Sequence, residues 1–147
     1  MKLDFKINKN ANNGIKYFVD ESLSGENHGL GLEYAILDND NWPYDKPEYN
    51  RTCGSLYDLV RAPNTAQNKS FEEWNQAEIR VEGNHISHWL NGVKTVDIIK
   101  DSPSYRELLS KSKYPNIQNW GDTEFGHILL QFEGTKASFR NIKIKEL

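Results

Sequence analysis

The chain has 147 residues, 12% of them aromatic, and a formal net charge of −3. Acidic and basic side chains are mixed along it, so it lacks the positive field that attracts nucleic acid or anionic lipid. Its apolar runs are too short to cross a bilayer, and its first residues include no signal-peptide hydrophobic region. We therefore expect a protein without membrane insertion or nucleic-acid partners, formed by one domain over residues 1–147.

Alternation of apolar and polar side chains with a period of two indicates strands from the first residues onward. Residues 3–7 begin this pattern, and residues 138–144 repeat it, with Arg140 and Ile142 expected on one face. Further candidate strands are bounded by Gly, Asn or Asp. They are residues 32–37, 55–60 and 127–132.

Residues 75–99 contain three short runs rich in Ile, Val, Thr and Trp, separated by Gly83-Asn84 and Asn91-Gly92. Asn-Gly is favoured in two-residue hairpins because both residues tolerate a positive φ. The segment therefore predicts a three-stranded antiparallel meander. At least seven strands with short turns indicate an all-β sandwich or barrel.

One short helix is expected after Ser102-Pro103-Ser104, because an apolar stripe with helical spacing follows. Ser104 and Glu107 have the spacing of a capping box at its N-terminus. Three other segments are too polar and too long for plain hairpin turns, and loops of this kind commonly line a site. They are residues 20–29, 38–52 and 114–124.

No generic catalytic motif is present, neither a phosphate-binding glycine loop nor a nucleophile-elbow serine. Loops and strand ends instead carry carboxylates, amides and aromatic rings, a mixture that suits the hydroxyl arrays and apolar C–H faces of sugars. Cys53 is the single cysteine, which excludes an internal disulfide. We expect it to be a small buried apolar residue.

Two carboxylates mark the expected strand 32–37. Glu33 lies within an apolar run and Asp38 ends that run, and a carboxylate in such a place is costly unless it is hydrogen-bonded or active. Each is therefore a candidate general acid or base. The alternatives are a salt-bridged or solvent-facing carboxylate at Glu33 and a turn-forming side chain at Asp38.

Other candidates are a cation and several aromatic side chains. Arg140 is suited to orient a sugar or neutralise developing negative charge, with a structural ion pair as an equal alternative. Tyr57 and Trp120 are candidate stacking platforms, although the core of a sandwich must bury most aromatic rings. His88 is more simply explained as a packed, hydrogen-bonded residue. The scattered lysines are expected to be solvated.

Six runs along the chain form a series. They are Asn13-Gly14-Ile15-Lys16-Tyr17-Phe18-Val19, Gly31-Leu32-Glu33-Tyr34 with Ile36-Leu37-Asp38, Gly54-Ser55-Leu56-Tyr57-Asp58-Leu59, Gly83-Asn84-His85 with His88-Trp89-Leu90-Asn91-Gly92-Val93-Lys94, Gly126-His127-Ile128-Leu129-Leu130-Gln131, and Phe139-Arg140-Asn141-Ile142-Lys143-Ile144. In this order, over nearly the whole chain, they resemble the 3-keto-disaccharide hydrolase family.

The resemblance implies a concanavalin A-like jelly-roll sandwich of two antiparallel sheets that holds a saccharide. It implies action on 3-keto sugars by a bacterial protein exported to the periplasm or the cell surface. No cofactor is implied, and participation of a divalent metal is left open. The family's recurrent polar positions correspond to Glu33, Asp38, Tyr57, Gln131 and Arg140.

The chain departs from the family at three places. Ala35 stands where the family has glutamine, Trp42-Pro43 replaces a His-Pro pair, and Phe132-Glu133-Gly134 replaces Asp-His-Gly. Glu133 is therefore a candidate base in place of a histidine, and Trp42 is a candidate saccharide contact. The resemblance begins partway into the family's domain, so we expect the chain to lack the family's first strands.

A 3-keto sugar can lose its C2 proton to a base, after which the enolate oxygen is stabilised and the group at C1 departs with acid assistance. We assign the base or acid role to Glu33 and stabilisation of the oxygen to Arg140 with Gln131. Asp38 or Glu133 is assigned the second proton transfer. Direct hydrolysis by a carboxylate pair is an alternative reaction. The other function classes are a non-catalytic carbohydrate-binding module and a structural sandwich without a ligand; the oligomeric state is left open.

Overall fold

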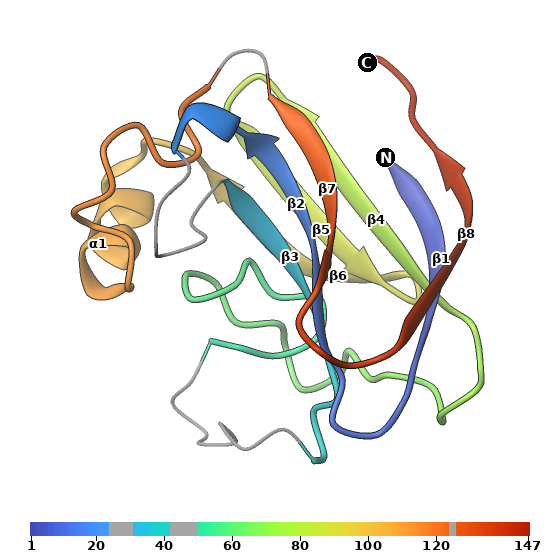
Figure 1. Cartoon of the computed structure of the whole chain (residues 1–147). Coiled ribbons are helices and arrows are strands. Elements are labelled where there is room, and N and C mark those ends of the chain that lie inside the picture. The colour runs from blue at the N-terminus through green and yellow to red at the C-terminus, as the bar shows by residue number, and fades with distance from the viewer. Residues whose placement is uncertain (24–30, 42–49, 124–125) are drawn as a thin grey trace.

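A computed structural model places the strands of the chain in two layers (Figure 1). It describes residues 1–23, 31–41, 50–123 and 126–147. Within these ranges lie eight strands, one α-helix and a short 3-10 helix at Glu21–Leu23. They are β1 (Lys2–Ile7), β2 (Asn12–Val19), β3 (Leu32–Leu37), β4 (Asn75–Glu82), β5 (His85–Leu90), β6 (Val93–Ile99), α1 (Pro103–Lys111), β7 (His127–Phe132) and β8 (Ala137–Lys143).

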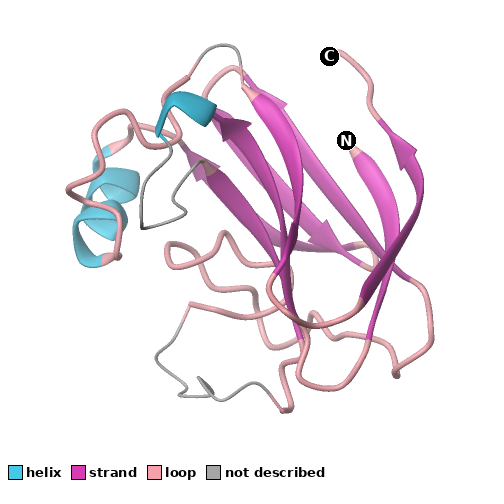
Figure 2. Ribbon diagram, in the orientation of Figure 1, coloured by secondary structure: helices cyan, strands magenta, loops and turns pink. Residues whose placement is uncertain are grey.

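The strands form two antiparallel sheets that pack face to face (Figure 2). One sheet has five strands in the order β6-β5-β4-β1-β8, and the other has three in the order β3-β2-β7. The predicted all-β sandwich with one short helix is confirmed. No helix in the described part of the chain has the length and apolar character needed to span a membrane.

The core lies between the two sheets and follows from the period of two along each strand. Phe5 and Ile86 face inward from the five-stranded sheet, and Ile15 and Tyr34 face them from the three-stranded sheet; all four are fully buried. The meander predicted at residues 75–99 is β4, β5 and β6. Asn91 and Gly92, in its second turn, both have positive φ angles, as the Asn-Gly pair predicts.

Strand β2 is the central strand of the three-stranded sheet and contains an irregularity. Phe18 has a φ of 52°, and the pairing of β2 with β7 shifts between Lys16 and Val19. The backbone of Gly31 packs tightly against this irregularity. A β-carbon at Gly31 would lie 2.5 Å from the carbonyl oxygen of Tyr17 and 2.7 Å from that of Phe18. Only glycine allows the chain entering β3 to approach β2 so closely.

The prediction of a strand at residues 55–60 is wrong. Leu56 forms isolated bridges with Tyr34 and with Val60, so the chain turns back on itself instead of extending. The positive φ of Asp58, 65°, lies within this turn. The turn nevertheless hydrogen-bonds to β3, because the amide of Tyr57 donates to the carbonyl oxygen of Glu33 at 2.9 Å. Residues 54–57 thus extend the three-stranded sheet beyond β3.

The C-terminal strand is confirmed, but its expected alternation is not. Asp4 of β1 pairs with Arg140 and Lys2 pairs with Lys143, so positions three residues apart in β8 lie on one face. The extra residue is accommodated by a bulge, in which Asn141 has a φ of 53°. The bulge reverses the alternation, and Ile142 therefore does not share the face of Arg140.

The predicted helix is confirmed as α1, with a different N-terminus from the one expected. Ser102, not Ser104, is the N-cap: its hydroxyl accepts a hydrogen bond from the amide of Tyr105 at 3.2 Å. Pro103 then occupies the first turn, where its missing amide proton costs nothing. The capping box of Ser104 with Glu107 is therefore not formed, since Ser104 already lies inside the helix.

The close approach at Gly31 gives a testable expectation. Gly31→Ala should destabilise the protein by about 1–3 kcal/mol, because the new methyl group overlaps backbone atoms that cannot move without disturbing β2. Gly83→Asn is the matched control, since a β-carbon at Gly83 meets nothing within 4 Å and asparagine tolerates its φ of 56°. Urea unfolding of both variants measures the difference. Equal losses of stability would contradict the packing described for Gly31.

Candidate functional site

The candidate site lies on the outer face of the three-stranded sheet. Lys16 of β2 is paired with Glu33 of β3 on one side and with Leu129 of β7 on the other. Gly14 is paired in the same way with Ala35 and Gln131. Because the neighbouring Ile15 and Tyr34 face the core, all six of these residues face away from it.

Small residues on this face make room for the Glu33 carboxyl group. A β-carbon at Gly14 would lie only 2.6 Å from Oε1 of Glu33, which shows that the carboxyl group bends over the backbone of β2. Ala35 and Ser55 beside it are also small and fully buried. The missing side chain at Gly14 therefore leaves the space that the Glu33 carboxyl group occupies.

Glu33 is a buried carboxyl group with an altered acidity. Only 6% of its surface is exposed, and Lys16 Nζ lies 3.8 Å from its Oε2. Burial raises the pKa of Glu33 to about 7, because removing a carboxylate from water disfavours its charged form. The positive charges of Lys16 and Lys113 lower this pKa, and the negative charge of Glu133 raises it, but burial is the largest effect. Glu33 can therefore gain or lose a proton near neutral pH.

A second lysine approaches the same carboxyl group from the segment after α1. The Nζ atom of Lys113 lies 4.9 Å from the centre of the Tyr57 ring and 5.1 Å from that of Tyr114. Its backbone amide donates to Oδ2 of Asp58 at 2.8 Å, while Oδ1 of Asp58 accepts from Arg51 Nε at 2.8 Å. The protein atoms around Lys113 lower its pKa by desolvation, although its surface as a whole is exposed. This arrangement holds a cation between two aromatic rings near Glu33.

Gln131 and Glu133 complete the described part of the site on β7 and the turn after it. The Nε2 amide of Gln131 donates to the carboxylate of Glu133. The Oε1 atom of Gln131 and the hydroxyl of Ser55 are buried and have no hydrogen-bond partner among the described atoms. Buried polar atoms are almost always hydrogen-bonded, so these two atoms are suited to contact a polar ligand.

The structure brings together four of the residues selected from the sequence. Glu33 and Gln131 belong to this face, Glu133 acts on the Glu33 carboxyl group, and the amide of Tyr57 donates to the carbonyl oxygen of Glu33. Trp42 lies outside the described residues.

Asp38 is held in a turn after β3. Its Oδ2 accepts a hydrogen bond from the amide of Asn10 at 2.8 Å, and its Oδ1 accepts from the amides of Asp40 and Asn41 at 3.2 and 3.3 Å. Both oxygens are thus used to fix the turn, which is the alternative that the sequence offers for this residue. The expected second proton transfer has no support from this geometry.

Arg140 does not lie at the site. It belongs to β8 in the five-stranded sheet, where its Nε donates to Asp4 Oδ2 at 3.2 Å and its guanidinium lies 3.9 Å from the ring centre of Trp74. The ion-pair alternative is the one that the structure shows. The expected cooperation of Arg140 with Gln131 is therefore wrong, because the two side chains project from different sheets.

Two other candidates belong to the core. Trp120 is buried and stacks on Tyr114, with ring centres 4.0 Å apart, so it presents no open face to a sugar. His88 is fully buried, and its Nε2 lies 2.8 Å from the hydroxyl of Tyr17. Burial lowers the pKa of His88 to about 3, which keeps the ring neutral. The expectation of a packed, hydrogen-bonded histidine is confirmed.

The lysines were the functional candidates that sequence reasoning missed. All lysines were expected to be solvated. Lys16 is buried, whereas Lys113 is exposed but lies close enough to Glu33 to lower the pKa of that carboxyl group. The signal for Lys16 was its place between Ile15 and Tyr17 in a strand without other charges, opposite a strand that also carries a lone charge. No comparable signal marks Lys113, because its position depends on how the segment after α1 folds back.

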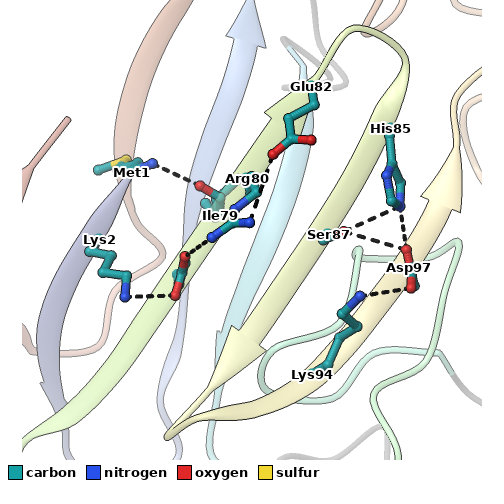
Figure 3. Close-up of polar contacts among 10 residues, drawn as sticks. Met1, Lys2, Ile79, Arg80, Glu82, His85, Ser87, Lys94 and Asp97 are labelled. Carbon is teal, nitrogen blue, oxygen red and sulfur yellow. Dashed lines mark hydrogen bonds and ion pairs between the residues drawn. The ribbon is translucent and has the colours of Figure 1, made fainter. Parts of the chain in front are cut away.

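The outer face of the five-stranded sheet carries charges of a different kind (Figure 3). Lys94, His85 and Ser87 surround the carboxylate of Asp97, and the first two lower the pKa of Asp97 to about 2. Arg80 bridges the carboxylates of Glu78 and Glu82. These groups are mostly exposed, so their ion pairs are screened by water. Across the described residues, no three His, Cys, Asp or Glu side chains are placed to hold a metal ion.

The charges around Glu33 can be tested by titration. Lys16→Met should raise the pKa of Glu33 further above 7, because it removes the largest favourable interaction with the carboxylate. Lys113→Met should raise it less, and Lys94→Met, on the other sheet, should leave it unchanged. The measurement is the side-chain carboxyl resonance of Glu33 by carbon-13 NMR as a function of pH. A Glu33 that titrates like an exposed glutamate in the parent protein contradicts this description.

The chain is similar to known proteins over nearly its whole length. A sequence model described as 3-keto-alpha-glucoside-1,2-lyase-like domain matches residues 1–145. A 3-keto-disaccharide hydrolase of Bacteroides thetaiotaomicron is 31% identical over 170 aligned positions, which cover 100% of this chain and 58% of that protein.

Two crystal structures of Parabacteroides distasonis proteins, assigned as glycosyl hydrolases, share the sandwich fold. They have TM-scores of 0.82 and 0.74 and are each 26% identical to this chain. The first alignment covers 95% of this chain and 66% of the other, and the second covers 99% and 76%. The expected family is confirmed by these matches, although the chain spans only 58% of the curated relative's length. The chain belongs to the 3-keto-disaccharide hydrolase family.

Proposed function

We propose that this chain cleaves the glycosidic bond of 3-keto disaccharides, with Glu33 as the base that removes the C2 proton. The observation that carries the proposal is a buried carboxyl group whose pKa is about 7, in contact with a lysine on one face of the sheet. A base is most effective when its pKa lies near the working pH. The matches to a 3-keto-alpha-glucoside-1,2-lyase-like domain and to a 3-keto-disaccharide hydrolase support this choice of substrate class.

The proposed reaction begins at the carbon beside the ketone. Glu33 takes the C2 proton, and the electron pair of the C2–H bond moves into a C2–C3 double bond, which leaves negative charge on the C3 oxygen. When the C3 carbonyl re-forms, a C1–C2 double bond forms and the C1–O bond breaks. The leaving sugar oxygen takes up a proton. Addition of water across C1 and C2 then completes a net hydrolysis.

The negative oxygen of the enolate needs a cation or a hydrogen-bond donor. Lys16 and Lys113 both act on the Glu33 carboxyl group, so each can also reach a substrate that approaches it. The side chain of Lys16 is buried, which strengthens its interaction with a developing anion. We assign them the role that the sequence had suggested for Arg140. Glu133, linked to Gln131, is the candidate for protonating the leaving oxygen.

The geometry favours catalysis over binding alone. A carbohydrate-binding module needs hydrogen-bonding groups and aromatic faces, but it gains nothing from burying a carboxyl group with a strongly raised pKa. Burying Glu33 beside Lys16 is unfavourable for folding, and carbohydrate binding alone does not require it. An active base explains that cost.

The direct test is turnover of a panel of 3-keto disaccharides by the parent protein and by Glu33→Gln. We expect the variant to lose about 10²–10⁴-fold in kcat/KM, the range typical for removal of a general base. For the parent, kcat/KM should rise with pH up to about 7, because Glu33 must be ionised to accept a proton. Glu82→Gln, an exposed carboxylate of the other sheet, is the control. Turnover that survives unchanged in Glu33→Gln rejects the assignment, and binding without turnover by the parent selects the binding module.

The position of the carboxyl group can be tested separately at Gly14. Gly14→Ala places a methyl group 2.6 Å from the present position of Oε1, so the carboxyl group must move and kcat should fall by at least about tenfold. Glu33→Asp shortens the side chain and relieves this overlap. The double variant should therefore be no slower than Glu33→Asp alone, which a double-mutant cycle of kcat values measures. Additive losses would show that the two residues do not interact.

A further inference from the structure

One turn contacts both Glu33 and the segment that carries Lys113. The amide of Tyr57 donates to the carbonyl oxygen of Glu33 at 2.9 Å, so these two residues are neighbours across the edge of β3. The next residue, Asp58, accepts a hydrogen bond from the backbone amide of Lys113 at 2.8 Å. Two consecutive residues therefore connect the candidate base to the segment that follows α1.

The turn that carries Asp58 is fixed by its own hydrogen bonds and by the core. The amide of Leu56 donates to the carbonyl oxygen of Val60 at 3.0 Å, and the amide of Val60 donates back at 2.9 Å. The side chains of Leu56 and Leu59 are buried in the core between the sheets. The turn is thus a firm support for the carboxylate of Asp58, which is itself buried.

The turn alone does not require a carboxylate at position 58. The φ of Asp58 is 65°, and glycine or asparagine adopts this conformation as readily as aspartate does. A carboxylate differs from both because it offers two acceptor oxygens and no donor. Both oxygens are used, since Oδ2 accepts from the Lys113 amide and Oδ1 accepts from Arg51 Nε, each at 2.8 Å. The residue type at this position therefore fits the two donors rather than the turn.

The position of the Lys113 ammonium group depends on its backbone. Among the residues that the structure describes, Nζ of Lys113 has two aromatic rings as its contacts, those of Tyr57 at 4.9 Å and Tyr114 at 5.1 Å from the ring centres, and no hydrogen bond or ion pair. A long, exposed side chain of this kind has many accessible rotamers. A shift of the backbone at Lys113 would therefore move the charge relative to the rings and to Glu33.

Lys113 and Glu33 act on each other electrostatically. The charge of Lys113 lowers the pKa of Glu33, and the charge of Glu33 raises the pKa of Lys113. Asp58 acts on Lys113 through its charge as well as through the hydrogen bond. The other charged groups that act on Glu33 or Lys113 are Lys16 of β2, Arg51 before the turn, and Glu133 after β7.

We propose that Asp58 is a positioning residue for the reaction: its carboxylate holds the backbone of Lys113, and with it the ammonium group, beside Glu33. The inference rests on the proposed function, in which Lys113 stabilises the enolate oxygen. The same carboxylate holds Arg51, whose guanidinium carbon lies 5.3 Å from the ring centre of Tyr57. A substrate that approaches Glu33 therefore meets Lys113 already in place, without the cost of ordering it during the reaction.

The first experiment follows the pKa of Glu33 in Asp58→Gly by carbon-13 NMR. Glycine tolerates the φ of 65° and removes both hydrogen bonds. Loss of the negative charge alone would lower the pKa of Glu33, whereas displacement of Lys113 raises it, so the sign separates positioning from a direct charge effect. We expect a rise at least half as large as that in Lys113→Met. An unchanged or lower pKa in a variant whose circular dichroism shows a folded protein overturns the proposal.

A double variant tests whether Asp58 acts through Lys113. In the Lys113→Met background, Asp58→Gly should add no further rise, because the cation is already absent. The same rise in this background as in the parent would show that Asp58 acts by another route, and it would reject the proposal.

Asp38→Gly is the matched control. Asp38 is also a buried carboxylate in a turn, and it also accepts a backbone amide at 2.8 Å, from Asn10. Its loss should leave the pKa of Glu33 unchanged. A rise as large as that in Asp58→Gly would mean that any loosened turn alters Glu33, which contradicts a specific role for Asp58.

Asp58→Asn provides a second variant that keeps nearly the same volume and tolerates the same φ. Asparagine has one acceptor oxygen for the two donors, and its amide group must face the other donor. The pKa of Glu33 should rise again, by less than in Asp58→Gly. If Asp58→Gly does not fold, the absence of a rise in Asp58→Asn is the result that overturns the proposal.

The second experiment measures kcat/KM for a 3-keto disaccharide as a function of pH. In Asp58→Gly the rising limb should move to higher pH by the shift that NMR measures, because Glu33 must be ionised to act as a base. Above this limb, kcat/KM should be about ten- to a hundredfold below that of the parent, since Lys113 is no longer held in place. An active parent whose limb does not move in Asp58→Gly refutes the positioning role alone. A parent without turnover refutes the proposed function and the role of Asp58 in it, whereas the NMR result still shows whether Asp58 holds Lys113 beside Glu33.

Discussion

The structure of the candidate site depends on one costly arrangement, the burial of the Glu33 carboxyl group over the backbone of Gly14. Water stabilises a carboxylate more than a single lysine can at 3.8 Å, so the pKa of Glu33 rises even though Lys16 is adjacent. A stronger ion pair would have kept Glu33 ionised and made it a weak base. A site without a cation would have kept it protonated at neutral pH. The intermediate balance gives a carboxyl group that changes protonation near pH 7.

The pairing register of β2 and β3 places the cation and the carboxyl group beside each other. Lys16 and Glu33 meet because β2 and β3 pair with these two positions directly opposite, on the face away from the core. The close approach of Gly31 to the irregularity at Phe18 lies where β3 begins to pair with β2. The outer faces of the two sheets therefore differ. On the three-stranded sheet the ion pair of Lys16 with Glu33 is buried, whereas on the five-stranded sheet the ion pair of Lys94 with Asp97 is exposed to water.

Much of the fold could be predicted from the sequence, because it depends on local patterns. The alternation of apolar and polar residues correctly predicted β1, and the Asn91-Gly92 turn correctly predicted the hairpin of β5 and β6. The failures were at places where one residue changes the geometry. The turn at Asp58 ended the expected strand 55–60, and the bulge at Asn141 put Ile142 on the other face from the one expected. A left-handed residue of this kind leaves no periodic signal in the sequence.

The site was predicted less completely than the fold. Glu33 could be selected because a lone carboxylate in an apolar run is costly, whereas Arg140 was chosen for its chemistry alone and lies on the other sheet. Which cations reach Glu33 depends on strand pairing and on how the segment containing Lys113 folds back, and neither is encoded in nearby residues. Residue type therefore indicated the chemistry of the site, but tertiary structure decided which side chains take part.

A crystal structure of Glu33→Gln with a bound 3-keto disaccharide would show whether the sugar binds on the face that carries Glu33. We expect C2 of the keto sugar to contact the substituted side chain at position 33, with the C3 oxygen toward Lys16 or Lys113. A sugar bound instead over Trp74 or Trp89, on the outer face of the five-stranded sheet, would contradict it.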